Sequence, residues 1–135
     1  MLTRTPIGLD AMVDTLKAAA ESSRLRILLM LSRGDLTVSD LTEVLNQSQP
    51  RVSRHLKLLL DAGLITRYQE GSWAYFRLAD DEYARETIQG VIARIDLADA
   101  TVERDLERLA EVKRRRQDRA LGYFSANAAS WDRIR

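Results

Sequence analysis

The feature that most constrains the fold is a change of hydrophobic period at Leu64. Before this residue, apolar positions recur at helical spacing, and after it polar and apolar residues alternate. Residues 65–69 and 73–78 therefore predict two strands, joined by a short turn that contains Gly71. A hairpin of this length is marginally stable alone. The chain is expected to fold as a helical domain on which one hairpin leans.

Three helices are predicted before the helix that precedes this hairpin. Residues 9–20 form a first amphipathic helix. Ser22 or Ser23 caps a second, strongly apolar helix, which stops near Gly34. Thr37 fits the N-cap of a short third helix of about two to three turns. One continuous helical core is expected from these segments.

A fourth helix begins at Ser48, with Pro50 in its first turn, where proline is tolerated. The helix covers about Gln49 to Asp61. Its predicted inner face consists of Val52, Leu56, Leu59, Leu60 and Gly63. Its outer face carries Gln49, Arg51, Ser53, Arg54 and His55. Residues 48–60 contain three basic and no acidic side chains, so this outer face is a basic surface.

The region after the hairpin predicts more helix. Asp80 or Asp81 caps a fifth helix, whose apolar stripe comprises Ile88, Val91, Ile92 and Ile95. A sixth pattern leads into a basic block at residues 113–119, and whether residues 97–99 interrupt the two patterns stays open. The expected organisation is a domain at residues 8–98, a C-terminal helix at 99–121 and a tail at 122–135.

Composition excludes several classes of protein. The chain is 45% hydrophobic and 30% charged, which is typical of a globular protein. Its longest apolar run has five residues, against roughly 20 for a membrane helix, and no secretory signal is seen, which predicts a cytoplasmic protein without membrane contact. Without cysteine, and with His55 as its one histidine, the chain predicts no disulfide, metal site or cofactor.

The order of these elements points to a function. The fold class expected is mainly α with one β-hairpin, in the order α-α-α-α-β-β-α plus a further C-terminal helix, which is the order of a winged helix-turn-helix. The second helix of such a pair enters the DNA major groove, where arginine pairs with guanine and Gln49 with adenine. The predicted DNA-binding residues are Ser48, Gln49, Arg51, Ser53, Arg54, His55, Lys57, Arg67, Gly71 and Ser72. Ser48, Lys57 and Arg67 are assigned to phosphates.

Several segments in this order resemble the ArsR/SmtB family. They are residues 22–28, 38–41, 48–57, 62–65 and 75–78. The resemblance implies a homodimer built from the first and fifth helices, which binds a palindromic operator and represses transcription until an effector releases it. The dimerisation residues expected are Leu9, Met12, Val13, Leu16, Ile88, Val91, Ile92 and Ile95. Thr37 and Ser39 stand where metal-sensing members carry cysteines, which argues against metal sensing.

The tail carries a second resemblance. Residues 122–132 resemble the lead-in to S-adenosylmethionine-dependent methyltransferase domains that follow some ArsR-like heads. This implies the head of a longer protein, with S-adenosylmethionine or S-adenosylhomocysteine as the effector. The chain lacks the glycine-rich nucleotide loop of such enzymes, so no catalytic residue is expected and the chain itself is predicted not to be an enzyme.

Four points stay open at this stage. The chain is a repressor, the DNA-binding or docking head of a methyltransferase, or a protein-interaction module. His55 either contacts a base or packs beside the hairpin. Trp73 and Tyr75 either form a stacking surface or stabilise the hairpin. The block at residues 113–119 either contacts DNA phosphates or is a solvated helix end.

Overall fold

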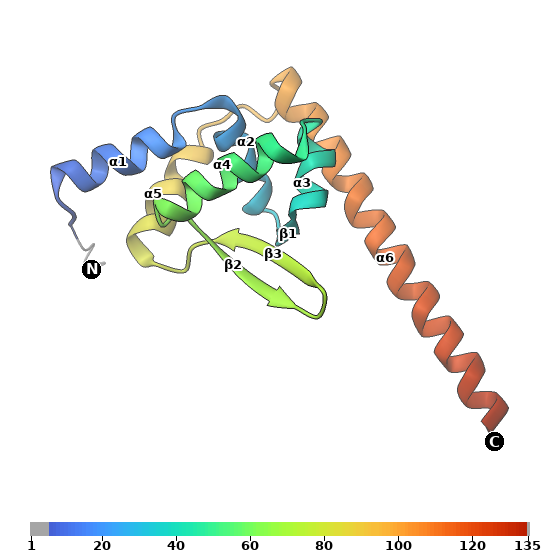
Figure 1. Ribbon diagram of the computed structural model, residues 1–135. Helices are drawn as coiled ribbons and strands as arrows, with labels where there is room; N and C mark the ends of the chain where they lie inside the picture. The colour runs from blue at the N-terminus through green and yellow to red at the C-terminus, as the bar shows by residue number, and fades with distance from the viewer. Residues whose placement is uncertain (1–5, 135) are drawn as a thin grey trace, which may run out of the picture.

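A small sheet lies along one side of a group of helices, and its hairpin projects from them (Figure 1). The computed structural model describes residues 6–134, with side chains from residue 6 to residue 122. The elements are α1 (Leu9–Ala19), α2 (Ser22–Leu31), β1 (Leu36–Thr37), α3 (Val38–Leu45), α4 (Gln49–Asp61), β2 (Ile65–Glu70), β3 (Trp73–Leu78), α5 (Glu82–Ile92) and α6 (Ala100–Ile134). The predicted mainly helical fold with one hairpin is confirmed.

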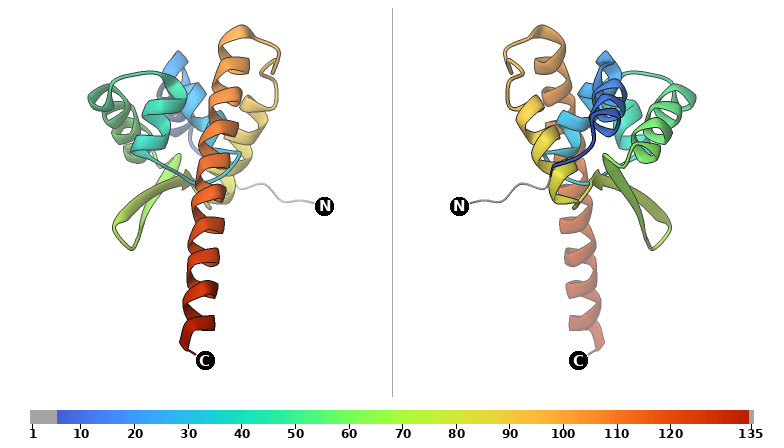
Figure 2. Two further views of the ribbon diagram at one scale, coloured as in Figure 1. Left: turned by 90° about the vertical axis from the view of Figure 1, so that its right-hand side faces the viewer. Right: turned by 90° about the vertical axis from the view of Figure 1, so that its left-hand side faces the viewer.

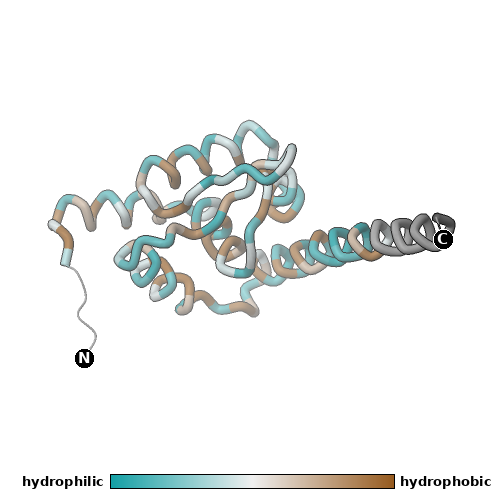
Figure 3. The backbone as a smooth tube through the Cα atoms, turned by 90° about the horizontal axis from the view of Figure 1, so that it is seen from below, coloured by the Kyte–Doolittle hydropathy of each residue, from teal (hydrophilic) through white to brown (hydrophobic). Residues whose placement is uncertain are grey.

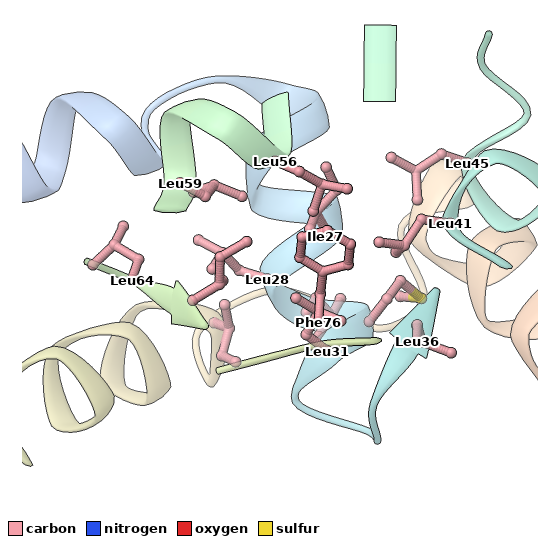
Figure 4. Packing of buried hydrophobic residues seen from close by; sticks show 14 of the residues in the cluster. Ile27, Leu28, Leu31, Leu36, Leu41, Leu45, Leu56, Leu59, Leu64 and Phe76 are labelled. Atoms are coloured by element: carbon pink, nitrogen blue, oxygen red, sulfur yellow. The ribbon is translucent and has the colours of Figure 1, made fainter. Parts of the chain in front are cut away.

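The apolar run of α2 is the centre of the core. Residues 27–31 are each at most 4% exposed. Figure 4 shows side chains from several elements gathered around them, among them Leu56 and Leu59 of α4 and Phe76 of β3. This burial supplies the hydrophobic stabilisation that the short hairpin lacks by itself. Helix α4 and the hairpin are therefore fixed to one rigid support.

A two-residue strand, β1, was not predicted. It pairs antiparallel with β3, Leu36 opposite Phe76 and Thr37 opposite Tyr75, and gives a sheet of order β1-β3-β2. A strand of two residues is too short to show the alternation of polar and apolar residues, so the hydrophobic pattern does not reveal it. Because β1 pairs with β3 and leads directly into α3, it connects the helices α3 and α4 to the hairpin.

The N-caps of α2 and α3 are acceptor side chains, and the one observed for α2 differs from the prediction. The N-cap of α2 is Glu21, whose carboxylate accepts from the Arg24 amide at 2.9 Å, so the prediction of Ser22 or Ser23 was wrong. The capping box of α3 is complete: the Thr37 hydroxyl accepts from the Asp40 amide, and the Asp40 carboxylate accepts from the Thr37 amide.

The chain after the hairpin also differs from its expected bounds. Helix α5 is capped by Asp81 and ends at Ile92, so Ile95 is not on this helix, although its side chain packs against the core. Turns at residues 93–99 separate α5 from α6, which settles the interruption left open above. Helix α6 begins at Ala100 and continues to Ile134, beyond the bound of 121 expected for the C-terminal helix.

Helix α6 runs along one side of the domain and then projects past it (Figure 2). It is a polar helix, and no helix in the described part of the chain is long and apolar enough to cross a bilayer. The tail resemblance at residues 122–132 falls on this projecting part. From residue 123 onward its side chains lie outside the described residues.

Candidate nucleic-acid interface

The outward face of α4 is held in place by its inward face. Val52, Leu56 and Leu59 are at most 2% exposed and pack into the core, while Leu60 is partly buried. Gly63 was predicted on this inner face but is exposed, with φ of +74°. It serves instead as the left-handed residue that turns the chain away from the helix toward β2.

The N-terminal half of α4 carries the candidate base-reading side chains. The Ser48 hydroxyl accepts from the Arg51 amide at 3.4 Å and caps the helix, as predicted. The Gln49 amide nitrogen donates to the Ser53 hydroxyl at 3.1 Å. Arg51 and Arg54 are exposed and form no ion pair with any described residue. These two guanidinium groups add to the partial positive charge of a helix N-terminus, a setting that attracts phosphate.

His55 is turned away from this surface. Its side chain is 13% exposed, with Nδ1 lying 3.3 Å from an Arg24 guanidinium nitrogen and 3.8 Å from Glu21. Because a guanidinium only donates, the imidazole accepts at Nδ1 and carries its proton on Nε2. Burial lowers the pKa of His55. The negative charge of Glu21 raises this pKa, whereas the positive charges of Arg24, Arg51 and Arg54 lower it. This geometry suits support of α4 on α2 better than contact with a base.

The remaining predicted DNA contacts line the end of α4 and the hairpin. Lys57 is 77% exposed and lies 3.5 Å from Asp61. Arg67 is exposed on β2, in register with Phe76. At the tip, Gly71 has φ of +61° and Ser72 is exposed, while Glu70 pairs with Trp73 inside the ladder. The connection is thus a two-residue turn, shorter than the three residues expected.

The aromatic pair of the hairpin is Tyr68 with Tyr75. Their rings stack with centroids 5.6 Å apart, across the two strands. The Tyr68 hydroxyl also donates to Asp35 at 2.5 Å, and this hydrogen bond raises the pKa of Tyr68 to about 12. Trp73 is 55% exposed and lies opposite Glu70. Tyr75 therefore stabilises the hairpin by stacking on Tyr68, a residue that the sequence analysis did not identify as its partner.

Most of the basic block at residues 113–119 is engaged by the protein itself. The Lys113 ammonium donates to the Arg33 carbonyl at 2.6 Å. Arg115 pairs with Glu43 and Arg116 with Asp40, both acids lying on α3. The Arg116 guanidinium also lies 5.8 Å from the centre of the Tyr75 ring. Through Arg115 and Arg116 the block binds α6 to α3. This role is neither of the two considered from the sequence, a contact with DNA phosphates or a solvated helix end.

The two positions that the resemblance assigns to metal ligands, Thr37 and Ser39, hold no thiolate. The Thr37 hydroxyl is used in the α3 cap, and Ser39 is exposed. Across the residues that the structure describes, no group of three or more histidine, cysteine, aspartate or glutamate side chains is placed to hold a metal ion.

The candidate dimerisation residues divide into three groups by exposure. On α1, Leu9, Val13 and Leu16 are 80%, 38% and 46% exposed, and Figure 3 shows apolar residues along this helix where it leaves the domain. On α5, Ile88 and Ile92 are at most 6% exposed and belong to the core of their own chain. The remaining members are partly buried: Met12, Val91 and Ile95. Among these candidate residues, Leu9, Val13 and Leu16 of α1 present the uncovered apolar surface.

The helix pair α3–α4, followed by a sheet-supported hairpin with a basic helix face beside it, defines a winged helix-turn-helix protein. Residues 21–67 match the model of the family described as "Bacterial regulatory protein, arsR family". The arsenic resistance transcriptional regulator ArsR1 of Pseudomonas putida is 36% identical over 104 residues, which cover 75% of this chain and 79% of that protein. The chain belongs to the ArsR family of bacterial regulatory proteins.

Two further proteins are similar to the chain. The arsenical resistance operon repressor of Bacillus subtilis is 48% identical over 67 residues, which span 49% of this chain and 64% of that repressor. The homodimeric winged helix-turn-helix DNA-binding domain Mb0332 of Mycobacterium bovis has a similar structure. Its TM-score is 0.56 at 30% identity, covering 63% of this chain and 80% of that domain.

Proposed function

We propose that this chain is a sequence-specific DNA-binding transcriptional repressor that acts as a homodimer. The observation that carries the proposal is the pair Arg51 and Arg54, which stand exposed on the N-terminal half of α4 without an ion-pair partner among the described residues. In a helix-turn-helix this half of the second helix meets the base edges. A cation that is solvated in the free protein is available for guanine or phosphate.

The other contacts divide by chemistry. Gln49 and Ser53 neighbour the two arginines on α4 and share their surface. Ser48, Lys57 and Arg67 are assigned to the DNA backbone, where contacts fix register, and Gly71 and Ser72 at the tip to the backbone or the minor groove. His55 is assigned to support of the helix because its side chain is 13% exposed and faces α2.

The relatives support the assignment of a repressor. The matched Bacillus subtilis protein is an operon repressor, and the matched Mycobacterium bovis domain is a homodimer. A two-fold dimer places two copies of α4 on successive major grooves, so the operator is a palindrome with half-sites about one helical turn apart. Affinity for such a site is expected at about 10⁻⁸ to 10⁻¹¹ M, falling as salt rises.

The test is a selection of genomic fragments by the purified chain, followed by binding to the enriched sequence across a salt series. Arg51→Ala with Arg54→Ala is expected to lower specific affinity at least about tenfold, because each base contact contributes roughly 1–3 kcal/mol. Arg104→Ala is the matched control, since it removes one exposed cation of α6 outside this surface. Enrichment of no sequence, or an equal loss in the control, would overturn the proposal.

A second candidate is the DNA-binding head of a fused S-adenosylmethionine-dependent methyltransferase, with the adenosyl compounds as effectors. The residues that support it are 122–132, by their resemblance to the lead-in of such domains. Calorimetric titration with S-adenosylmethionine and S-adenosylhomocysteine tests it, together with operator binding in the presence of each. Absence of heat and of any change in operator affinity would rule out these effectors for this chain.

A further inference from the structure

Asp105 is a buried charge away from the candidate interface. It lies on α6, its side chain is 0% exposed, and it accepts three hydrogen bonds from two arginines. Arg26 of α2 donates to both carboxylate oxygens, at 2.7 and 2.8 Å. Arg108 of α6 donates to one of them at 2.9 Å. A carboxylate buried to this degree is costly unless every lone pair is used, so its position is tightly specified.

The two arginines reach past Asp105 to the end of α3. Nη2 of Arg26, which also donates to Asp105, donates to the Leu45 carbonyl at 2.9 Å, and Nε of Arg108 donates to the Val44 carbonyl at 2.6 Å. These are the last two carbonyls of α3, which lack a donor within the helix. Cations at a helix C-terminus are also favoured by the helix dipole. Asp105 thus orients two arginines that cap α3.

The capped end of α3 is also the start of the turn to α4. Asn46, in the left-handed conformation with φ of +54°, follows Leu45 directly, and α4 begins at Gln49. A displacement of the α3 end therefore shifts the first turn of α4, where Arg51 lies. Two other ion pairs between α6 and α3 act elsewhere: Arg115 pairs with Glu43 and Arg116 with Asp40, through side chains on the body of α3.

We propose that Asp105, through Arg26 and Arg108, is a positioning residue that sets the α3–α4 turn and thereby the register of α4 on its operator. This inference rests on the proposed DNA-binding function. It assigns a role in sequence discrimination to α6, a helix outside the helix-turn-helix and the hairpin. The network joins α2, α3 and α6 at one point, so α4 starts from a fixed platform.

The test compares Asp105→Asn with Arg115→Gln, which removes an α6–α3 ion pair without touching the turn carbonyls. Binding to the selected operator and to unrelated DNA is measured for each. Asp105→Asn is expected to weaken operator binding about ten- to a hundredfold, the size of one or two lost base contacts, and to change non-specific binding by no more than about twofold. Arg115→Gln is expected to keep the ratio of the two affinities.

Hydrogen exchange of the backbone at residues 44–52 is the readout that requires no DNA. Faster exchange there in Asp105→Asn, with Arg115→Gln unchanged, supports positioning even if no operator is ever enriched. Arg108→Gln removes the Val44 bond but keeps the Asp105–Arg26 pair, so it carries the test if Asp105→Asn does not fold. Equal losses of operator and unrelated DNA, with unchanged exchange at the turn, would reduce the cluster to a simple docking contact.

Discussion

At the scale of residues, the cations of this chain differ by what they contact. Arg51 and Arg54 are exposed and form no ion pair with a described residue, whereas Arg115 and Arg116 are neutralised by acids of α3. The two pairs look alike in the sequence, because each belongs to a short segment that is rich in basic residues. Availability for DNA is therefore decided by tertiary contacts, and only the first pair is free to release counterions on binding.

His55 gives the fold a pH dependence whose sign follows from its surroundings. Its pKa is lowered from 6.5 in the folded protein, first of all by burial, so the unfolded chain takes up the proton more readily. Stability is then unaffected well above pH 6.5 and falls as the pH drops through that value toward the folded pKa. The expected result is a lower free energy of unfolding at about pH 5.5 than at about pH 7.5.

The matched variant is His55→Asn, whose amide oxygen can replace Nδ1 as acceptor for Arg24 but does not titrate. Urea denaturation of both proteins at the two pH values measures the effect. The variant should lose less stability on acidification than the parent. If both proteins lose the same free energy of unfolding on acidification, the pH dependence comes from carboxylates and not from His55.

The local N-caps of α3 and α4 were predictable, whereas the long-range contacts of Asp105 were not. Thr37 and Ser48 were predicted as N-caps from their place before an apolar pattern, and the structure confirms both. Asp105 gave no such signal, because its partner Arg26 lies 79 residues earlier in the chain. A charged residue within a charged helix pattern looks solvated unless its distant partner is known.

At the scale of elements, Ser48 caps the N-terminus of α4 and is also the residue that we propose to contact a DNA phosphate there. Its hydroxyl caps the helix by accepting from the Arg51 amide. Ser48→Ala should lower the free energy of unfolding by about 1 kcal/mol, since the amide loses its acceptor. Ser48→Asp keeps an acceptor and should keep stability, yet its negative charge should weaken DNA binding.

Chemical denaturation and operator titration of the two variants separate these roles. The aspartate variant should lose operator affinity while remaining as stable as the parent. If it binds DNA as tightly as the parent, Ser48 lies away from the phosphates and its role is confined to the cap.

Elements with a clear period were predicted well, and short or irregular ones were not. Helix α4 and the hairpin follow periods of helix and strand over many residues, and their bounds came out close to the structure. Strand β1, with two residues, has no period to detect. Ile95 continues the apolar spacing of α5 although the helix has ended at Ile92, because core packing also selects apolar residues in turns.

At the scale of the whole molecule, α1 leaves several large apolar side chains without a covering partner among the described residues. The hydroxyls of Thr15 and Tyr83 are 2.5 Å apart and hold α1 to α5. Leu9, Val13 and Leu16 nevertheless remain exposed. Exposed side chains of this size along one helix are typical of a surface that a second subunit covers. We expect α1 to be the main seam of the homodimer, with Ile88 and Ile92 supporting it from the core below.

Leu16→Asp tests this seam because it places a charge beside the exposed apolar side chains of Leu9 and Val13. The variant should be monomeric by light scattering and should bind the palindromic operator at least about a hundredfold more weakly, since two linked half-site contacts become independent. Leu121→Asp is the control, as Leu121 is 59% exposed on α6, away from α1. A dimeric Leu16→Asp with full affinity would place the interface elsewhere, whereas a monomeric one with full affinity would show that a single copy of α4 suffices.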